Sequence, residues 1–361
     1  MQHIKRLPGT LITTIIEYME INCRTGNAGI KYFRLLNKYY YQMIKEQLDN
    51  NILNLYVKYS NYDRIKKYQL HINGIFFNNK TLNINTIIKQ LNIKQYYMLS
   101  IWDNRLSNET LYKLQGITKL YIHSAENLND ESLKILTDNN NVLDTLYIDD
   151  GYNITDDGLQ YLKDIKTLYI SYCDNITVRG IQYFARNIHT LSLISCQNIN
   201  DDALEQLKNI HTLTLENCKG ITNNGLKHFA NGNIHTLILY DCFTIVDNDL
   251  QNIAGNNLHT FDCNNWKYIT DIGLSYLTNI KTLTIADGNF ITNEGLKHLQ
   301  NIKCLDISFC YCITDDGLQY LQNIKELTIN LCNQITREGL KYFNLEKQKV
   351  FIHRWGQPLI N

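Results

Sequence analysis

The stretch IKTLYISYCDNITVRGIQYF, residues 165–184, decides the fold because close copies of it recur along the chain. The stretches IHTLTLENCKGITNNGLKHF at 210–229 and IKCLDISFCYCITDDGLQYL at 302–321 share its template, I-x-x-L-x-I-x-x-C-x-x-I-T-x-x-G-L-x-x-L. A period of 22 to 26 residues, most often 22, indicates a repeat protein in which each unit packs against its neighbours. The clear copies begin at Ile117, Leu143, Ile165, Ile188, Ile210, Ile234, Leu258, Ile280, Ile302 and Ile324.

Each copy combines two hydrophobic periods. Leu168 and Ile170 alternate with polar residues, which indicates a strand with one buried face, whereas Leu159 and Leu162 recur three apart, which indicates a short helix. One strand and one helix cannot bury a core alone, so we expect stacked copies with a continuous parallel sheet backed by helices. Seven threonines stand where a helix N-cap belongs: Thr155, Thr177, Thr222, Thr270, Thr292, Thr314 and Thr336. The aspartates that directly follow three of them, Asp156, Asp271 and Asp315, suit the first turn of a helix because of the helix dipole.

A column of cysteines tests this register. Trp266 and Gly288 take the position in two copies. One thiol per repeat, with no C-x-x-C pair, does not match a zinc site and predicts a buried column of small apolar side chains. The cysteines that lie eight residues after the start of their copies are Cys173, Cys196, Cys218, Cys242, Cys310 and Cys332.

The copies resemble leucine-rich repeats of the cysteine-containing subclass, clearly over residues 93–361 and weakly over the irregular opening repeats or linker at 48–92. Fragments in the weaker part are Ile52-Leu55-Val57 and Ile65-Leu70, and KQKVFIHRW after position 346 forms a last, capping copy. This resemblance implies an α/β fold, a leucine-rich-repeat solenoid shaped as a horseshoe. Its parallel sheet is concave and its helices lie on the convex side.

Residues 1–47 do not fit the repeat and read as two amphipathic helices separated by the polar stretch 22–29. The Leu7-Pro8 opening, the Tyr18-Met19 end of the first helix and the segment LLNKYYYQMI at 35–44 resemble an F-box. The usual Asp-Leu pair between the helices is absent, and Asn37 stands at the usual Cys or Ser position. The alternative is a small helical cap that shields the first repeat.

The F-box resemblance implies an all-α module that docks on the Skp-type adaptor of a cullin–RING ubiquitin ligase. Burial of apolar side chains in a groove of the adaptor would drive this docking. The residues that the resemblance assigns to adaptor binding are Leu7, Pro8, Leu11, Ile12, Ile15, Ile16, Leu35 and Leu36.

Polar strand positions predict the binding face. Carboxylates outnumber bases there and tyrosines cluster, which favours a protein partner with basic and apolar groups and disfavours nucleic acid. An ordinary solvated strand face in a chain with 25 tyrosines is the alternative. The candidate substrate-binding residues are Tyr147, Asp149, Tyr169, Ser171, Tyr172, Glu216, Tyr240, Asp241, Asp262, Asp287, Asp306 and Phe309.

Motifs of catalysis and cofactor binding are missing from the sequence. It contains no phosphate-binding glycine loop, no H-E-x-x-H and no G-x-S-x-G, so we expect no enzymatic activity and no cofactor. A histidine column suggests a metal site or a pH sensor, but the lysines at the same position of other copies indicate a tolerant, partly exposed site, and we expect no metal. The column comprises His189, His211, His235 and His259, and the lysines are Lys166, Lys281, Lys303 and Lys325.

Composition sets the remaining expectations. The net charge is +0, there are 2 prolines, and no apolar run reaches the length of a membrane span, so we expect a folded protein with reduced thiols in the cytoplasm or nucleus. Ile, Asn, Lys and Tyr, which have AT-rich codons, are abundant, which suggests an AT-rich genome. If that genome is viral, we expect the protein in the host cytoplasm. The sequence predicts a non-catalytic substrate receptor of a ubiquitin ligase. A stand-alone repeat scaffold, a repeat inhibitor of an enzyme, and a metal or pH sensor are the alternatives.

Overall fold

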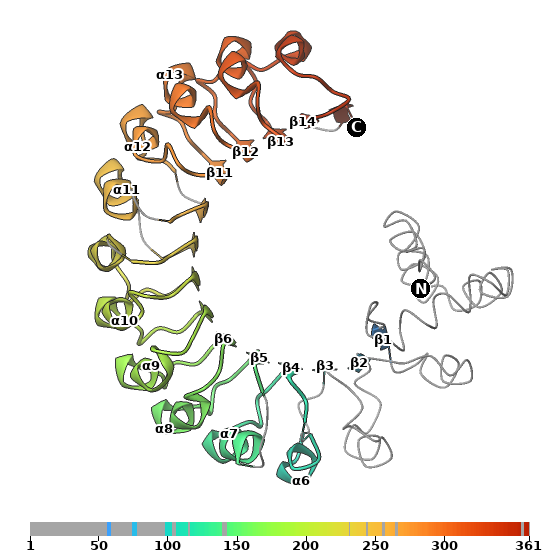
Figure 1. The fold of residues 1–361 in the computed structure, drawn as a ribbon, viewed down its shortest axis with the longest axis vertical. Helices are drawn as coiled ribbons and strands as arrows, with labels where there is room; N and C mark the ends of the chain where they lie inside the picture. The colour runs from blue at the N-terminus through green and yellow to red at the C-terminus, as the bar shows by residue number, and fades with distance from the viewer. Residues whose placement is uncertain are drawn as a thin grey trace, which may run out of the picture.

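The computed structural model describes residues 56–58, 74–77, 98–102, 106–114, 116–138, 143–230, 232–242, 245–254, 257–263, 266–354 and 357–360. These residues form one 15-stranded sheet whose strands follow each other in chain order. Figure 1 shows an arc with the strands on its inner side and the helices on its outer side. The expected leucine-rich-repeat architecture, a horseshoe with a concave parallel sheet and convex helices, is confirmed.

The strands are β1 (Tyr56–Lys58), β2 (Gly74–Phe77), β3 (Met98–Trp102), β4 (Lys119–His123), β5 (Thr145–Ile148), β6 (Thr167–Ser171), β7 (Thr190–Ile194), β8 (Thr212–Glu216), β9 (Thr236–Tyr240), β10 (Thr260–Cys263), β11 (Thr282–Ala286), β12 (Cys304–Ser308), β13 (Glu326–Asn330), β14 (Lys349–Arg354) and β15 (Gln357–Ile360). The α-helices are α6 (Asn108–Leu111), α7 (Asp130–Thr137), α8 (Asp156–Leu159), α9 (Val178–Phe184), α10 (Asp201–Gln206), α11 (Asp247–Ile253), α12 (Asp271–Ser275) and α13 (Asn293–Leu296). The 3₁₀ helices are η3 (Gln160–Leu162), η4 (Asn223–Phe229), η5 (Lys297–Leu299), η6 (Asp315–Leu321) and η7 (Arg337–Tyr342).

The core lies between the sheet and the helices. Leu168 and Ile170 of β6 are 0% and 1% exposed, and both are in register with apolar residues of the strands on either side. The intervening Tyr169 faces away from the core and is half-buried. The alternation that predicted strands therefore sets the register, because a slip of one residue would expose every apolar strand position.

The cysteine column lies where each strand leaves the sheet, and its prediction as a buried column is confirmed. Cys242 is half-buried and the other five cysteines of the column are buried. The Cys173 thiol donates to the Gly151 carbonyl at 3.1 Å, and a methyl group added at Gly151 would lie 2.4 Å from that sulfur. The contact with the Cys196 thiol, and then burial, raise the pKa of Cys173, so this thiol stays protonated.

The residue directly before each column position adopts a left-handed backbone conformation. Nine non-glycine residues have φ between 51° and 63° at this point of the repeat, and the N–H groups of six of them donate to the following repeat. The Tyr172 N–H, for example, donates to the Ile194 carbonyl at 2.9 Å. L-residues are strained in this region, so the repeat geometry holds the turn against a local preference. The nine are Ser124, Asp150, Tyr172, Ser195, Asn217, Asp241, Asp287, Phe309 and Leu331.

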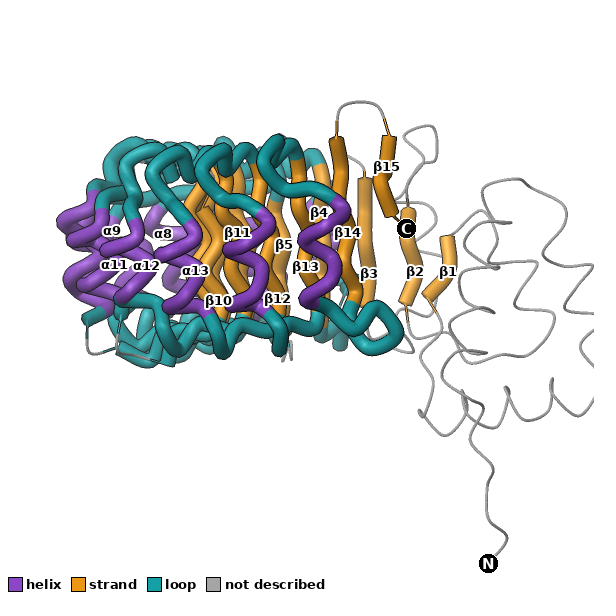
Figure 2. Tube along the Cα trace, turned by 90° about the horizontal axis from the view of Figure 1, so that it is seen from above, coloured by secondary structure: helices purple, strands orange, loops and turns teal. Residues whose placement is uncertain are grey.

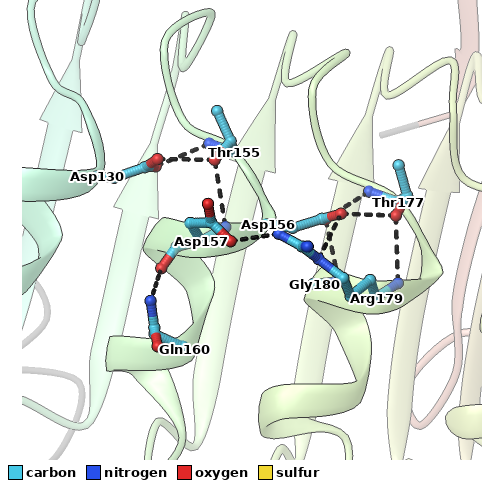
Figure 3. A network of polar contacts seen from close by, with 8 residues as sticks. All are labelled: Asp130, Thr155, Asp156, Asp157, Gln160, Thr177, Arg179 and Gly180. Atoms are coloured by element: carbon cyan, nitrogen blue, oxygen red, sulfur yellow. Dashed lines mark hydrogen bonds and ion pairs between the residues drawn. The ribbon is translucent and has the colours of Figure 1, made fainter.

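Helix starts connect neighbouring repeats through a contact that we name the aspartate–threonine lock. The Asp156 carboxylate, on the first residue of α8, accepts from the Thr177 N–H and the Thr177 hydroxyl, both at 2.7 Å, and from the Gly180 N–H at 3.0 Å. The Thr177 hydroxyl in turn accepts from the Arg179 N–H and caps α9 (Figure 3). The six locks are Asp130–Thr155, Asp156–Thr177, Asp201–Thr222, Asp247–Thr270, Asp271–Thr292 and Asp315–Thr336.

The expected threonine N-caps are confirmed, and six of the seven also cap their helices through the side chain. Thr314 is the exception, because Asn293 stands where a lock has aspartate and donates its amide N–H to the Thr314 hydroxyl at 2.8 Å. The Asn293 amide oxygen still accepts from the Thr314 N–H, at 3.0 Å. Asparagine therefore reverses the side-chain hydrogen bond of the lock.

Between the repeats of β4 and β13, two boundaries have neither the aspartate nor the threonine of a lock. Val178 and Asn223 replace the aspartate, and the N-caps of the repeats that follow are Asn200 and Val246 instead of threonine. At the second boundary Asp249, within the following helix, accepts from the Val246 N–H at 2.9 Å. The first boundary is between the repeats of β6 and β7, and the second is between those of β8 and β9.

The ends of the sheet differ from the sequence expectation. The last repeat copy forms β14, which pairs parallel with β13 as expected, but the chain then reverses and β15 pairs antiparallel with β14 (Figure 2). Val57 lies on a strand, β1, whereas the fragment at 65–70 is outside the described residues and the next strand is β2, at 74–77. Residues 1–47, with all the expected adaptor-binding residues, also lie outside the described part.

A membrane-spanning helix was not expected from the sequence. Within the described residues, no helix is both long and apolar enough to cross a bilayer.

Candidate protein-binding face

The concave face is built from two rows of side chains that cross the strands. The middle row contains the residues in register with Tyr147, from Tyr121 on β4 to Thr328 on β13. The exit row contains the residues two positions later in each repeat, from His123 to Asn330, where the strands end. Parallel in-register strands place equivalent side chains of successive repeats next to each other, about 4.8 Å apart.

Three tyrosines of the middle row form the first cluster. The Tyr147 ring lies between those of Tyr121 and Tyr169, with centroid distances of 6.2 and 5.9 Å. The ring of His123, from the exit row, lies 4.9 Å from the Tyr147 ring. All four side chains are half-buried, so they form an aromatic surface that is open to the concave side.

Carboxylates border this aromatic surface at the end of β5. Asp149 accepts a short hydrogen bond from the Ser171 hydroxyl, and Asp150 accepts from the Tyr152 hydroxyl at 3.1 Å. Burial, and then the charges of Asp149 and Asp150, raise the pKa of Tyr147. The negative potential of both carboxylates therefore reaches the middle row.

His123 does not neutralise these carboxylates near pH 7. Burial lowers its pKa below the ordinary value of 6.5, and the opposing effect of Asp149 is smaller. The neutral imidazole therefore adds aromatic surface without adding a positive charge. We name Tyr121, His123, Tyr147, Asp149 and Tyr169 the β5 cluster.

A second cluster lies on β8 to β10. The Tyr240 hydroxyl donates to the Asp262 carboxylate at 2.5 Å, and Glu216 is in register with Tyr240 on the adjacent strand. Burial, and then the hydrogen bond to Asp262, raise the pKa of Tyr240, so the phenol stays neutral and holds the carboxylate in place. Exposed Asp241 follows directly after Tyr240. We name Glu216, Tyr240, Asp241 and Asp262 the β9 cluster.

The other predicted residues do not join these clusters through contacts in the described structure. Asp306 accepts from Ser308 at 3.1 Å and from Asn330 at 3.3 Å. It is on β12, and β11 separates it from Asp262 on β10. Asp287 and Phe309 occupy the left-handed turn position, as does Tyr172, whose ring lies 5.9 Å from that of Tyr152. Ser171 is only 4% exposed, so its role on this face is to orient Asp149.

The two rows carry charge of one sign. From β4 to β13, the described residues of the middle and exit rows include four carboxylates and neither lysine nor arginine. The carboxylates are Asp149, Glu216, Asp262 and Asp306. A surface of this sign attracts cationic groups and repels phosphates.

The histidine column lies just before the strands and stacks across four repeats. Ring centroids of successive histidines from His189 to His259 are 4.2, 4.1 and 5.3 Å apart, and the planes are within 20° of parallel. Lone pairs of parallel stacked rings do not converge on one point, as ligands of a metal must. Accordingly, no group of three or more His, Cys, Asp or Glu side chains in the described part of the chain is placed to hold a metal ion.

Comparisons with known proteins agree with this architecture. A family model described as a leucine-rich repeat matches residues 298–321. A chain in the crystal structure of the Rad7 and Elc1 complex from yeast superposes on this protein with a TM-score of 0.50 at 16% sequence identity. The alignment covers 96% of this protein and 98% of the chain in that complex. The chain has the leucine-rich-repeat fold.

A second structure, an internalin (inlF) from Listeria monocytogenes, has a TM-score of 0.46 at 17% identity over 73% of this chain and 82% of its own. No curated protein sequence matches the chain. At 16% identity the likeness to the Rad7–Elc1 chain concerns the fold alone, because one fold carries many different functions.

Sequence reasoning missed two members of the β5 cluster, Tyr121 and His123. They lie four and six residues after Ile117, at the same leucine-rich-repeat positions as Tyr147 and Asp149 after Leu143. The signal was present, but the copy that begins at Ile117 lacks both the cysteine and the I-T segment, whereas every other clear copy has at least one of them. Applying the register to that copy would have found both residues.

Proposed function

We propose that the protein is a non-catalytic substrate-recognition subunit of a cullin–RING ubiquitin ligase. In this proposal the N-terminal segment binds the Skp-type adaptor and the concave face binds a protein target. The observation that carries it is the acidic and aromatic character of the concave face, which the strands form on the inner side of the arc (Figure 1). Its combination with an F-box-like N-terminal sequence at 1–47 points to a receptor rather than to an isolated scaffold.

The solenoid supports this role through geometry. A sheet of parallel strands in one continuous register gives a rigid surface of fixed curvature, and rigid surfaces lose little conformational entropy on binding. A receptor of this kind accelerates ubiquitin transfer by proximity: it holds the target's lysines near the ubiquitin-charged enzyme, and all bond chemistry takes place on other subunits.

The test is co-purification of the adaptor and the cullin with the tagged full-length protein from cells. We expect the wild type to capture both, and a variant with Leu7→Ala, Pro8→Ala and Ile12→Ala to capture neither, because these changes remove the apolar residues assigned to the adaptor groove. The matched control is Thr10→Ala, Thr13→Ala and Thr14→Ala, which changes polar residues of the same segment. The ligase role is wrong if wild type and triple variant capture equal amounts.

A stand-alone scaffold or inhibitor is the second candidate, because both concave clusters lie within the repeats and use no residue of the N-terminal segment. It requires that a target remain bound after the three apolar substitutions and that the target's abundance in cells be unaffected. A receptor requires instead that the target accumulate when the adaptor-binding residues are replaced.

A further inference from the structure

Both clusters of the concave face are built to hold a positive charge against an aromatic ring. We propose that the face binds an extended segment of the partner that carries two basic side chains, one at the β5 cluster and one at the β9 cluster. This inference rests on the proposed function only in using the concave face as the binding surface. It adds the chemistry of the bound segment and the spacing of its two anchors.

The β5 cluster provides three features for the first anchor. The Tyr147 ring lies between two other tyrosine rings and forms a half-buried aromatic floor, against which a guanidinium or ammonium group stacks favourably. One oxygen of Asp149 is held by Ser171, and its other oxygen has no hydrogen-bond partner among the residues that the structure describes. That oxygen is available to a charged donor above the ring.

The neutrality of His123 strengthens this first anchor site. A protonated imidazole 4.9 Å from the Tyr147 ring would compete with an incoming cation. Burial keeps the pKa of His123 low, so near neutral pH this competitor is absent. The cluster then retains the net negative charge of Asp149, increased by that of neighbouring Asp150.

The β9 cluster repeats the same combination with different residues. The Tyr240 phenol is a ring in the exit row, and its hydrogen bond fixes the Asp262 carboxylate beside it. Glu216, one strand away in the same row, adds a second carboxylate, and both are half-buried. Partial burial makes an ion pair stronger than on a fully exposed surface, because the local dielectric is lower.

The distance between the clusters determines the spacing of the two basic residues. Asp149, directly after β5, and Tyr240 on β9 lie in the same exit row, so four inter-strand steps of about 4.8 Å separate them by roughly 19 Å. An extended chain advances about 3.3 Å per residue, so roughly six residues cover this distance. Side chains on one face of an extended chain recur every two residues, which favours a separation of six over five or seven.

The surface between the clusters suits the backbone of such a segment. Ser192 on β7 and Thr214 on β8 occupy the middle row there, and Ser192 is buried. Ile194 occupies the exit row between Ser171 and Glu216. These uncharged side chains, of which Ser192 and Thr214 are short, leave room for a peptide main chain to cross the strands.

The test uses full-length protein and fluorescein-labelled synthetic peptides of 15 residues, built from Gly, Ser and Ala, that carry two arginines at separations of two to nine positions. We expect fluorescence anisotropy to show tightest binding near a separation of six, at least five-fold tighter than at two or nine. Glutamate in place of both arginines should abolish binding. Raising NaCl from 50 to 300 mM should weaken it several-fold, because the anchors are ionic.

Variants identify the anchors. Tyr147→Ala, Asp149→Asn and Asp262→Asn should each weaken binding of the best peptide by about five-fold or more and remove the preference for six, because each leaves one anchor. The matched controls are Tyr183→Ala on α9 and Asp316→Asn on η6, an exposed tyrosine and an exposed aspartate on the helix side, and both should bind as the wild type does. Thermal melting shows whether each variant is folded. If Tyr147→Ala unfolds, the two asparagine substitutions still test both anchors, because they do not change the shape of the side chain.

The inference is overturned if affinity does not depend on the arginine separation, or if the cluster variants bind like the controls. Capture of the Skp-type adaptor is measured on the same preparations. Intact adaptor capture without a preference for six rejects this inference alone. Loss of adaptor capture by the wild type, with the peptide preference retained, rejects the ligase role alone.

Discussion

The substitution Asn293→Asp is expected to stabilise the protein, because it converts the one reversed contact into a complete aspartate–threonine lock. Asn293 now donates to the Thr314 hydroxyl at 2.8 Å, and that hydroxyl makes no cap bond to its own helix. An aspartate would accept from the hydroxyl, whose lone pair could then accept from a backbone N–H of η6, as in the other locks.

The magnitude follows from the bonds that change. The hydrogen bond from the Thr314 N–H to the Asn293 amide oxygen, 3.0 Å long, would be replaced by a bond to a charged carboxylate, like the 2.7–2.8 Å bonds of the six locks. The regained helix cap is worth about 1 kcal/mol. Repulsion from neighbouring Asp271 and Asp315 offsets part of the gain. Adjacent carboxylates are tolerated, since Asp247 and Asp271 carry consecutive locks. We expect a net increase of about 1 kcal/mol in the free energy of unfolding.

The assay is urea unfolding followed by circular dichroism at pH 7. Asp271→Asn is the reciprocal variant in the preceding repeat, and it should lower the free energy of unfolding by about 1–2 kcal/mol, because it weakens a complete lock. The reasoning is refuted if both substitutions shift the midpoint in the same direction, or if neither shifts it.

Three further predictions concern the scaffold. Gly273→Ala should lower the free energy of unfolding by about 2 kcal/mol or more in a urea titration, although alanine favours helix. The reason is that the added methyl group would lie 2.4 Å from the Asp247 carboxylate. An unchanged midpoint would contradict this. Leu331→Gly should raise the thermal midpoint and increase the free energy of unfolding by up to about 1 kcal/mol, because a φ of 56° strains leucine. A lower midpoint would show that the packing of the Leu331 side chain contributes more than the strain costs. Burial, and then the charges of His235, His189 and His259, lower the pKa of His211 below 6.5. The unfolded chain therefore binds more protons than the folded one, and stability that is present above pH 6.5 is lost as the pH falls. The urea midpoint should drop between pH 7.5 and 5.5, and it should drop less in His211→Gln.

The sequence was sufficient to predict the strands from β3 to β14, the threonine caps and the cysteine column, because each is determined by a local period. The locks could not be predicted in the same way. Asp156 suited its helix start through the dipole alone, whereas its main partners lie on Thr177, in the next repeat. One signal was available: two of the copies that lack the aspartate, at Val178 and Asn223, are followed by copies without the threonine.

The candidate site was predicted in part for a related reason. Tyr147 and Tyr169 follow from strand alternation, but alternation does not distinguish an open position from one that a neighbour covers. Ser171 is buried because it donates to Asp149 of the preceding repeat. The reversal at β15 has no counterpart in the repeat template, since it is the point where the template ends.

The two boundaries without a lock have a consequence for how the molecule comes apart. A linear array unfolds as cooperative blocks whose borders lie at its weakest interfaces. The boundaries after β6 and after β8 flank a two-repeat block, β7 and β8, so we expect hydrogen exchange to divide the array there instead of reporting one global opening. The stacked rings of His211 and His235 span the second boundary, 4.1 Å apart. Mild acid should therefore speed exchange first at this junction, while the repeats from β10 to β13, which are joined by two locks and the Asn293–Thr314 contact, remain protected.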